Sequence, residues 1–235
     1  MNFMMIDTET TNSLDDPIVY DVGYEIFDEN GATIEKASMT NKDIFLDKEF
    51  MSTAYYAEKI PNYWKEIWAK KRELLSWREI KWRVFDACKR NDCEIVAAHN
   101  ARFDRLALNL TQRYITTSKH RFFLPYGTTW WCSLRMVKEV LKENEEYKKF
   151  CKYYNFMTAN NQPRYTAEIV YKFLTGDVDF EEVHQGIDDV EIEKEIFLWC
   201  LKQKPDIDGR LFKPKPEPVK PLEPWEIEIA ELMAS

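Results

Sequence analysis

The stretch FMMIDTETT, residues 3–11, combines a short apolar run with two carboxylates at its end. The apolar residues 3–7 favour a buried β-strand. Because side chains alternate along a strand, Asp7 and Glu9 are predicted to point to the same side. Neighbouring carboxylates repel each other, and a bound divalent cation is one reason to place them together. A polar strand edge in solvent explains the pair as well, and this stretch alone favours that simpler interpretation.

The rest of the chain supplies strand and helix patterns that would surround this strand. Residues 18–27 are rich in β-branched and aromatic side chains, and the sequence DENG at residues 28–31 predicts a turn. Further strands are expected at residues 32–39, 93–98 and 128–132, and helices at residues 54–90 with a break at Pro61, 101–114, 133–144, 147–154, 165–174 and 188–203. This order predicts an α/β fold with a mixed sheet flanked by helices.

Composition restricts the partners of the protein. Its 235 residues are 45% hydrophobic, which is enough for a sizeable core. No apolar run approaches the roughly 20 residues that span a membrane, so no membrane partner is expected. Five cysteines without a CxxC pair predict reduced thiols and a cytoplasmic protein. The net charge of −8 requires any contact with nucleic acid to be local or metal-mediated.

Two further segments carry acids next to predicted elements. In HNARFD, residues 99–104, Asp104 falls in the first turn of a helix and on its sheet-facing side. A helix dipole would favour an acid there equally well. In HQGIDD, residues 184–189, Asp189 shares a helix face with apolar Ile196, whereas Asp188 faces outward. We therefore choose Asp189 as the functional acid, although a solvated acidic helix start and a surface His184 remain alternatives.

Together the three segments offer four carboxylates and one histidine. Two-metal hydrolysis of a phosphodiester requires such a set, because oxygen ligands hold a pair of Mg²⁺ or Mn²⁺ ions. A neutral histidine can accept a proton from the attacking water near neutral pH. The set predicts a nuclease centre with Asp7, Glu9, Asp104 and Asp189 as metal ligands and His184 as the base.

The same segments resemble the motifs of the DEDDh subgroup of DnaQ-like 3′→5′ exonucleases. The motifs DTETT, HNxxFD and HxxxxD of that family stand here as residues 7–11, 99–104 and 184–189, in the same order. Gln185, where the tyrosine subgroup would begin its third motif, indicates the histidine subgroup. The region from Tyr165 through the third motif also resembles small exonucleases carried by bacteriophages.

The resemblance implies a fold and a set of roles. It implies an RNase H-like fold with a mixed five-stranded sheet, two Mg²⁺ or Mn²⁺ ions bridged by Asp7, and His184 as general base. Thr10 and Phe103 would line the pocket for the 3′-terminal nucleotide. Asn12 stands where the family usually has glycine, and asparagine tolerates the left-handed conformation of such a turn. Gly186 and Val190 replace the usual alanine beside the third-motif acid.

Residues 59–90 interleave basic residues with four tryptophans. They could guide and stack a single strand, but an amphipathic helix with inward tryptophans and solvated lysines is the favoured interpretation. The sequence KHRFF at residues 119–123 is a second candidate for the substrate path. His120 is not expected to be catalytic, and His99 is expected to be structural.

Six of the ten prolines lie between Pro205 and Pro224 and predict an extended linker. We therefore expect an exonuclease domain at residues 1–204, followed by a tail at residues 205–235. The amphipathic segment 222–235 would dock either on its own domain or on a protein partner.

The sequence thus predicts a 3′→5′ exonuclease acting on nucleic acid, preferably on the 3′ ends of single-stranded DNA. An RNase or oligoribonuclease of the same family is an alternative, because no residue decides whether a 2′-hydroxyl is accepted. A domain that binds nucleic acid or protein without cleaving is a further alternative, which the complete carboxylate set disfavours.

Overall fold

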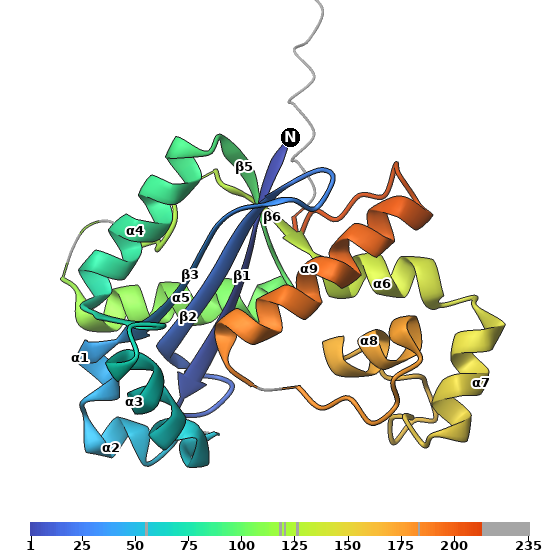
Figure 1. The fold of residues 1–235 in the computed structure, drawn as a ribbon, viewed down its shortest axis with the longest axis horizontal. Helices are drawn as coiled ribbons and strands as arrows, with labels where there is room; N and C mark the ends of the chain where they lie inside the picture. The colour runs from blue at the N-terminus through green and yellow to red at the C-terminus, as the bar shows by residue number, and fades with distance from the viewer. Residues whose placement is uncertain (55, 118, 120, 126, 183, 213–235) are drawn as a thin grey trace, which may run out of the picture.

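The computed structural model describes residues 1–54, 56–117, 119, 121–125, 127–182 and 184–212. Its centre is a six-stranded sheet in the order β4-β3-β2-β1-β5-β6 (Figure 1). The strands are β1 (Asn2–Thr11), β2 (Ile18–Asp28), β3 (Thr33–Asn41), β4 (Glu73–Leu75), β5 (Cys93–Ala98) and β6 (Thr129–Cys132). β1, β2 and β3 pair antiparallel, whereas the β1–β5, β5–β6 and β3–β4 pairs are parallel. The predicted mixed sheet is confirmed, and the three-residue β4 adds an edge strand to the five expected.

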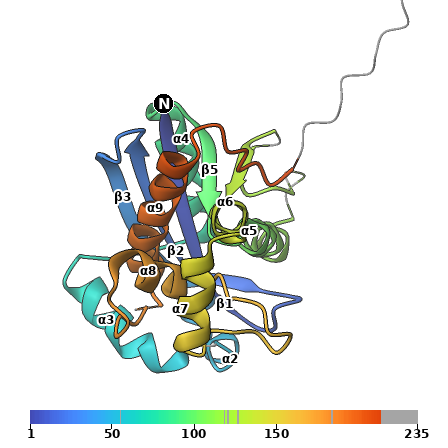
Figure 2. The same cartoon turned by 90° about the vertical axis from the view of Figure 1, so that its right-hand side faces the viewer.

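Helices cover both faces of this sheet. They are α1 (Lys42–Phe45), α2 (Lys48–Met51), α3 (Ile60–Trp68), α4 (Trp77–Arg90), α5 (Ala101–Ile115), α6 (Ser133–Leu141), α7 (Glu145–Tyr153), α8 (Ala167–Thr175) and α9 (Gly186–Gln203), with a 3-10 turn at Ala57–Lys59. α4 and α5 pack on one face, and α9 packs on the other together with α6 and α8. Figure 2 looks onto the second side, where α7, α8 and α9 stand in front of the strands.

β1 alternates between two hydrophobic cores. Met4 and Ile6 are buried in the core beneath α4 and α5, whereas Phe3 and Met5 are buried in the core beneath α9. This period of two places the next odd-numbered residues, Asp7 and Glu9, on the α9 side near the end of the strand.

Two glycines allow α9 to begin directly on the sheet. Gly23 lies in the middle of β2, opposite Asp7 of β1. A Cβ atom on Gly23 would lie 2.2 Å from the carbonyl carbon of Gly186, the first residue of α9. The close approach of the two backbones sets the distance between β1 and the start of α9.

The region predicted as one long helix with a break at Pro61 folds differently. Pro61 lies in the first turn of α3, where its missing amide hydrogen costs nothing, and β4 separates α3 from α4. Ser76 starts α4 through a capping box with Glu79. The break was expected at Pro61, but it lies between α3 and α4, because the start signal at Ser76 was not recognised.

The prediction of inward tryptophans holds only in part. Trp77 is fully buried and its indole nitrogen donates to Gln112, whereas Trp68 is 76% exposed and Trp82 is 58% exposed. The two exposed rings were therefore misassigned to the core.

The segment after α9 returns to the sheet. The amide of Cys132 donates to the carbonyl oxygen of Gly209 at 2.8 Å, and the amide of Leu211 donates to that of Trp130 at 2.7 Å. Residues that follow the predicted boundary at 204 thus pack along β6. The segment 222–235 and His120 lie outside the described residues. No helix in the described part of the chain is long and apolar enough to cross a membrane.

Candidate functional site

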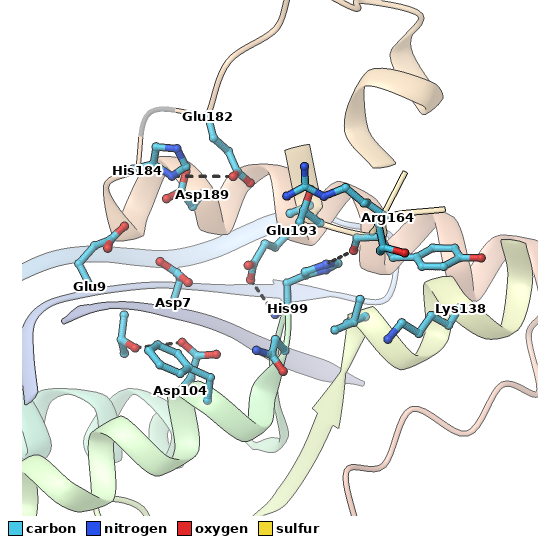
Figure 3. Close-up of a pocket in the computed structure, with 18 of the residues that line it drawn as sticks. Asp7, Glu9, His99, Asp104, Lys138, Arg164, Glu182, His184, Asp189 and Glu193 are labelled. Atoms are coloured by element: carbon cyan, nitrogen blue, oxygen red, sulfur yellow. Dashed lines mark hydrogen bonds and ion pairs between the residues drawn. The ribbon is translucent and has the colours of Figure 1, made fainter. Parts of the chain in front are cut away.

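A cavity of about 670 Å³ opens where β1 and β5 end beside α9. Its lining includes six carboxylates and two histidines, and it brings together all three sequence segments (Figure 3). These residues are Asp7, Glu9, His99, Asp104, Glu182, His184, Asp189 and Glu193. The four acids and the histidine predicted from sequence therefore share one cavity.

The two predicted pocket residues behave differently. Phe103, which was expected to line the nucleotide pocket, lines this cavity. Thr10 is not among the lining residues, whereas Thr8 is. The β1–β2 register shifts between Glu9 and Thr10, so the strand alternation does not continue unchanged beyond Glu9.

Asp104 is held by the turn that starts α5. Asn100 adopts a left-handed conformation, with φ of 68°, and its carbonyl oxygen accepts from the amide of Phe103 at 2.8 Å. Asp104 is 2% exposed, and its carboxylate accepts from the Thr8 hydroxyl at 3.0 Å. The hydrogen bond connects the acid of α5 to the strand that carries Asp7.

A buried ion pair holds the start of α9. The Asp21 carboxylate on β2 contacts the guanidinium of Arg72 and accepts from the backbone amide of Gly186 at 3.1 Å. Arg72 also donates to the side-chain oxygen of Gln185 at 3.2 Å. One turn later Asp189 is 6% exposed and lines the cavity, whereas Asp188 does not line it.

His184 stands at the mouth of the cavity. Its backbone is left-handed, with φ of 54°, and its ring stacks on Tyr56 with centroids 4.2 Å apart and planes 10° apart. Its Nδ1 atom lies 3.8 Å from a carboxylate oxygen of Glu182. Burial and the nearby Lys59 lower the pKa of His184, so the ring is neutral at neutral pH.

Glu182 and Glu193 were missed by sequence reasoning. Glu193 is one helical turn after Asp189 on the same face, so the helical period was a usable signal. It is 4% exposed, and its carboxylate accepts from the amide of His99 at 3.0 Å. Glu182 lies in a segment without periodicity, and no sequence signal identified it.

His99, which was expected to be structural, lines the cavity and links two segments of the chain. Its Nε2 lies 2.8 Å from the carbonyl oxygen of Tyr165, and its Nδ1 lies 2.9 Å from the hydroxyl of Ser133. Because a carbonyl only accepts, Nε2 carries the hydrogen and Nδ1 accepts from the hydroxyl. Burial lowers the pKa of His99 to about 4, which keeps the ring neutral. The residue connects the end of β5 to the segment before α8.

The carboxylates repel one another. Burial, followed by Glu193 and Asp104, raises the pKa of Asp7, and burial followed by Asp189 raises that of Glu9. Burial raises the pKa of Asp104 to about 7, although the Thr8 hydroxyl opposes the shift. Burial and Glu182 raise the pKa of Asp189 to about 8.

The residues present fit divalent cations. Asp189 Oδ1 is buried and has no hydrogen-bond partner among the described residues. One ligand atom from each of Glu9, His184 and Asp189 lies within 4.8 Å of the others. A cation would neutralise the repulsion and satisfy the orphaned oxygen, and hard oxygen donors suit Mg²⁺ or Mn²⁺.

The repulsion predicts how stability depends on pH without metal. The folded pKa values of Asp104 and Asp189 rise from 3.8 to about 7 and about 8, so the folded state binds more protons than the unfolded state. Their contribution to the free energy of unfolding is complete below 3.8 and is lost as the pH rises towards 8. We expect Mn²⁺ to raise the melting temperature more at about pH 8 than at about pH 5.5, measured calorimetrically against EDTA. Equal stabilisation at both values would contradict this.

The fold is RNase H-like, and solved exonucleases share it. Exonuclease X, in complex with 5′-overhanging duplex DNA, aligns with a TM-score of 0.50 at 14% identity, over 86% of this chain and 93% of that chain. Exonuclease I from Methylocaldum szegediense aligns with a TM-score of 0.55 at 15% identity, over 87% of this chain and 41% of that chain. Escherichia coli exonuclease I, in complex with a dT13 oligonucleotide, aligns with a TM-score of 0.53 at 13% identity, over 87% and 42%.

This chain therefore spans less than half the length of exonuclease I. At these identities the likeness establishes the fold. No protein-family model matches the sequence, and no curated protein matches it by sequence.

Proposed function

We propose that this protein is a metal-dependent 3′→5′ exonuclease that hydrolyses single-stranded DNA to nucleoside 5′-monophosphates. The observation that carries the proposal is the convergence of Asp7, Glu9, Asp104, His184 and Asp189 in one cavity. These residues come from three distant segments, and a chance surface cluster would not be expected to unite them. The structural likeness to exonucleases supports the same reading.

Asp7, Glu9, Asp104 and Asp189 would hold two Mg²⁺ or Mn²⁺ ions. When bound, such ions activate water and neutralise charge on the phosphate. His184 accepts the proton of the attacking water, because its lowered pKa leaves the ring unprotonated. Phe103, on the cavity wall, offers a face for the terminal base.

The choice of DNA as the substrate rests on the solved structures that share the fold. The solved complexes of exonucleases I and X contain DNA, and one exonuclease I structure is a complex with SSB-Ct. By analogy, a protein partner for residues 222–235 stays part of the proposal. RNA is the second candidate substrate.

A gel assay tests the proposal directly. A 5′-labelled single strand, as DNA and as RNA, is incubated with the protein in Mn²⁺ or EDTA. We expect a ladder that shortens from the 3′ end only with metal, and faster for DNA than for RNA. Faster cleavage of RNA would move the assignment to an RNase, and no cleavage of either strand would favour a binding domain.

A further inference from the structure

The cavity has two walls of opposite charge. Five carboxylates project from β1, α5 and α9 and a sixth, Glu182, from the segment before α9, whereas Arg164 and Lys138 project from the other side (Figure 3). Lys138 lies on α6, and Arg164 lies in the segment that leads into α8. Sequence reasoning assigned no role to either cation.

Both cations are available to a ligand. Their side chains are exposed to solvent at the cavity, and neither forms an ion pair with any residue that the structure describes. By contrast, Arg72 pairs with Asp21 and Arg90 pairs with Asp86 elsewhere in the described chain. Because no described carboxylate neutralises these two cations, they can bind an anion in the cavity.

The backbone that carries the cations is fixed relative to the carboxylates. The carbonyl oxygen of Arg164 accepts from the buried Tyr147 hydroxyl, and its amide donates to the carbonyl oxygen of Phe156 at 3.0 Å. The next carbonyl, that of Tyr165, lies 2.8 Å from Nε2 of His99. The amide of His99 in turn donates to the carboxylate of Glu193. These hydrogen bonds connect the two walls of the cavity. The backbone that carries Arg164 is therefore already ordered, and a ligand would lose less binding free energy to ordering it.

Lys138 approaches the same place from α6. Its Nζ atom lies 6.0 Å from the centroid of the half-buried Tyr165 ring. Arg164 offers a planar fork that suits phosphate oxygens, and Lys138 offers a compact charge.

The overall charge favours a local cationic subsite. With a net charge of −8 and six acids in the cavity, the protein repels an anionic strand unless local cations oppose the repulsion. Removal of nucleotides from a 3′ end leaves nearly the whole strand on the 5′ side of the cleaved bond. A cationic wall beside the carboxylates is placed to hold that side.

We propose that Arg164 and Lys138 form a subsite for a backbone phosphate of the single strand, on the 5′ side of the bond that is cleaved. The subsite rests on the proposed function, because it assumes that the carboxylates mark the position of cleavage. The two residues bind the strand and position it, and they take no part in proton transfer.

Binding without turnover tests the subsite. The affinity of a fluorescent oligo(dT) is measured by anisotropy in EDTA over a series of salt concentrations. The proteins are wild type, Arg164→Gln and Lys138→Gln, with Arg78→Gln and Lys142→Gln as controls. The controls remove the same charges from exposed positions on α4 and at the end of α6, outside the cavity.

We expect each cavity variant to bind about tenfold more weakly at low salt, since a charge-assisted contact to phosphate is lost. The slope of log K against log salt should fall in magnitude by about 0.7 for each phosphate contact removed. The controls should keep the wild-type slope. Unchanged affinity and slope in both cavity variants, or equal losses in the controls, would overturn the subsite.

Two further outcomes separate the subsite from the proposed function. A wild-type protein that binds the strand but never cleaves it, with weaker binding by the variants, overturns the exonuclease and keeps only the phosphate contact of the two cations, without its position relative to a cleaved bond. Cleavage by wild type with normal binding by both variants overturns only the subsite. Competition by thymidine 5′-monophosphate shows whether the two cations bind a phosphate of the strand or the phosphate of the released nucleotide. If the variants lose affinity for the mononucleotide as much as for the strand, the cations hold the released nucleotide and the assignment to the 5′ side is wrong.

Discussion

Replacing His184 by alanine should lower the rate of cleavage by about 10²–10⁴-fold, the usual contribution of a general base. The ring is neutral at neutral pH because burial lowers its pKa, and it lies at the cavity mouth rather than among the most buried acids. If it serves only as a base, the variant should bind metal as wild type does. Single-turnover cleavage and the shift in melting temperature caused by Mn²⁺ measure the two properties separately.

The matched comparison is Asp7→Asn. Asp7 is surrounded by acids, and burial together with Glu193 and Asp104 raises its pKa. Asparagine removes that repulsion, so the metal-free variant should melt at a higher temperature than wild type, while both cleavage and stabilisation by Mn²⁺ are lost.

A ring nitrogen of His184 also belongs to the group that could hold an ion with Glu9 and Asp189. The thermal shift decides between the two roles. If His184→Ala loses stabilisation by Mn²⁺ as completely as Asp7→Asn does, His184 is a ligand and the base must be sought elsewhere. Unchanged turnover in His184→Ala would remove the residue from the mechanism.

The central sheet was predictable because apolar runs and β-branched or aromatic residues mark its strands. In β1 the odd and even residues enter different cores, and the same alternation places Asp7 and Glu9 on one side. In α9 the helical period separated Asp189, which lines the cavity, from Asp188, which does not. Local periodicity therefore fixed the orientation of side chains within each element.

Contacts between distant elements were not predictable in this way. The cationic wall depends on the packing of α6 and the segment before α8 against His99, and no periodic pattern in the sequence encodes that packing. The same holds for Glu182, which reaches the cavity from an irregular segment. Arg72 received no role of its own within the basic stretch 59–90, although its side chain is fully buried against Asp21.

The buried position of Arg72 leads to the largest expected effect on stability. Its guanidinium contacts Asp21, donates to Glu66 at 2.8 Å and to Gln185 at 3.2 Å, and lies 4.2 Å from the centroid of the Tyr63 ring. Burial already raises the pKa of Asp21 in the presence of Arg72. Without the guanidinium, the Asp21 carboxylate would remain buried with no positive charge beside it.

Arg72→Met should therefore lower the free energy of unfolding by about 3–5 kcal/mol, measured by urea denaturation. The control Arg83→Met removes an exposed pair with Glu73 and should cost about 0–1 kcal/mol. The double variant Arg72→Met with Asp21→Leu should be more stable than Arg72→Met alone, because no unpaired charge remains buried. If the double variant is less stable than the single one, the loss arises from packing or from the amide of Gly186, and the charge of Asp21 is not its cause.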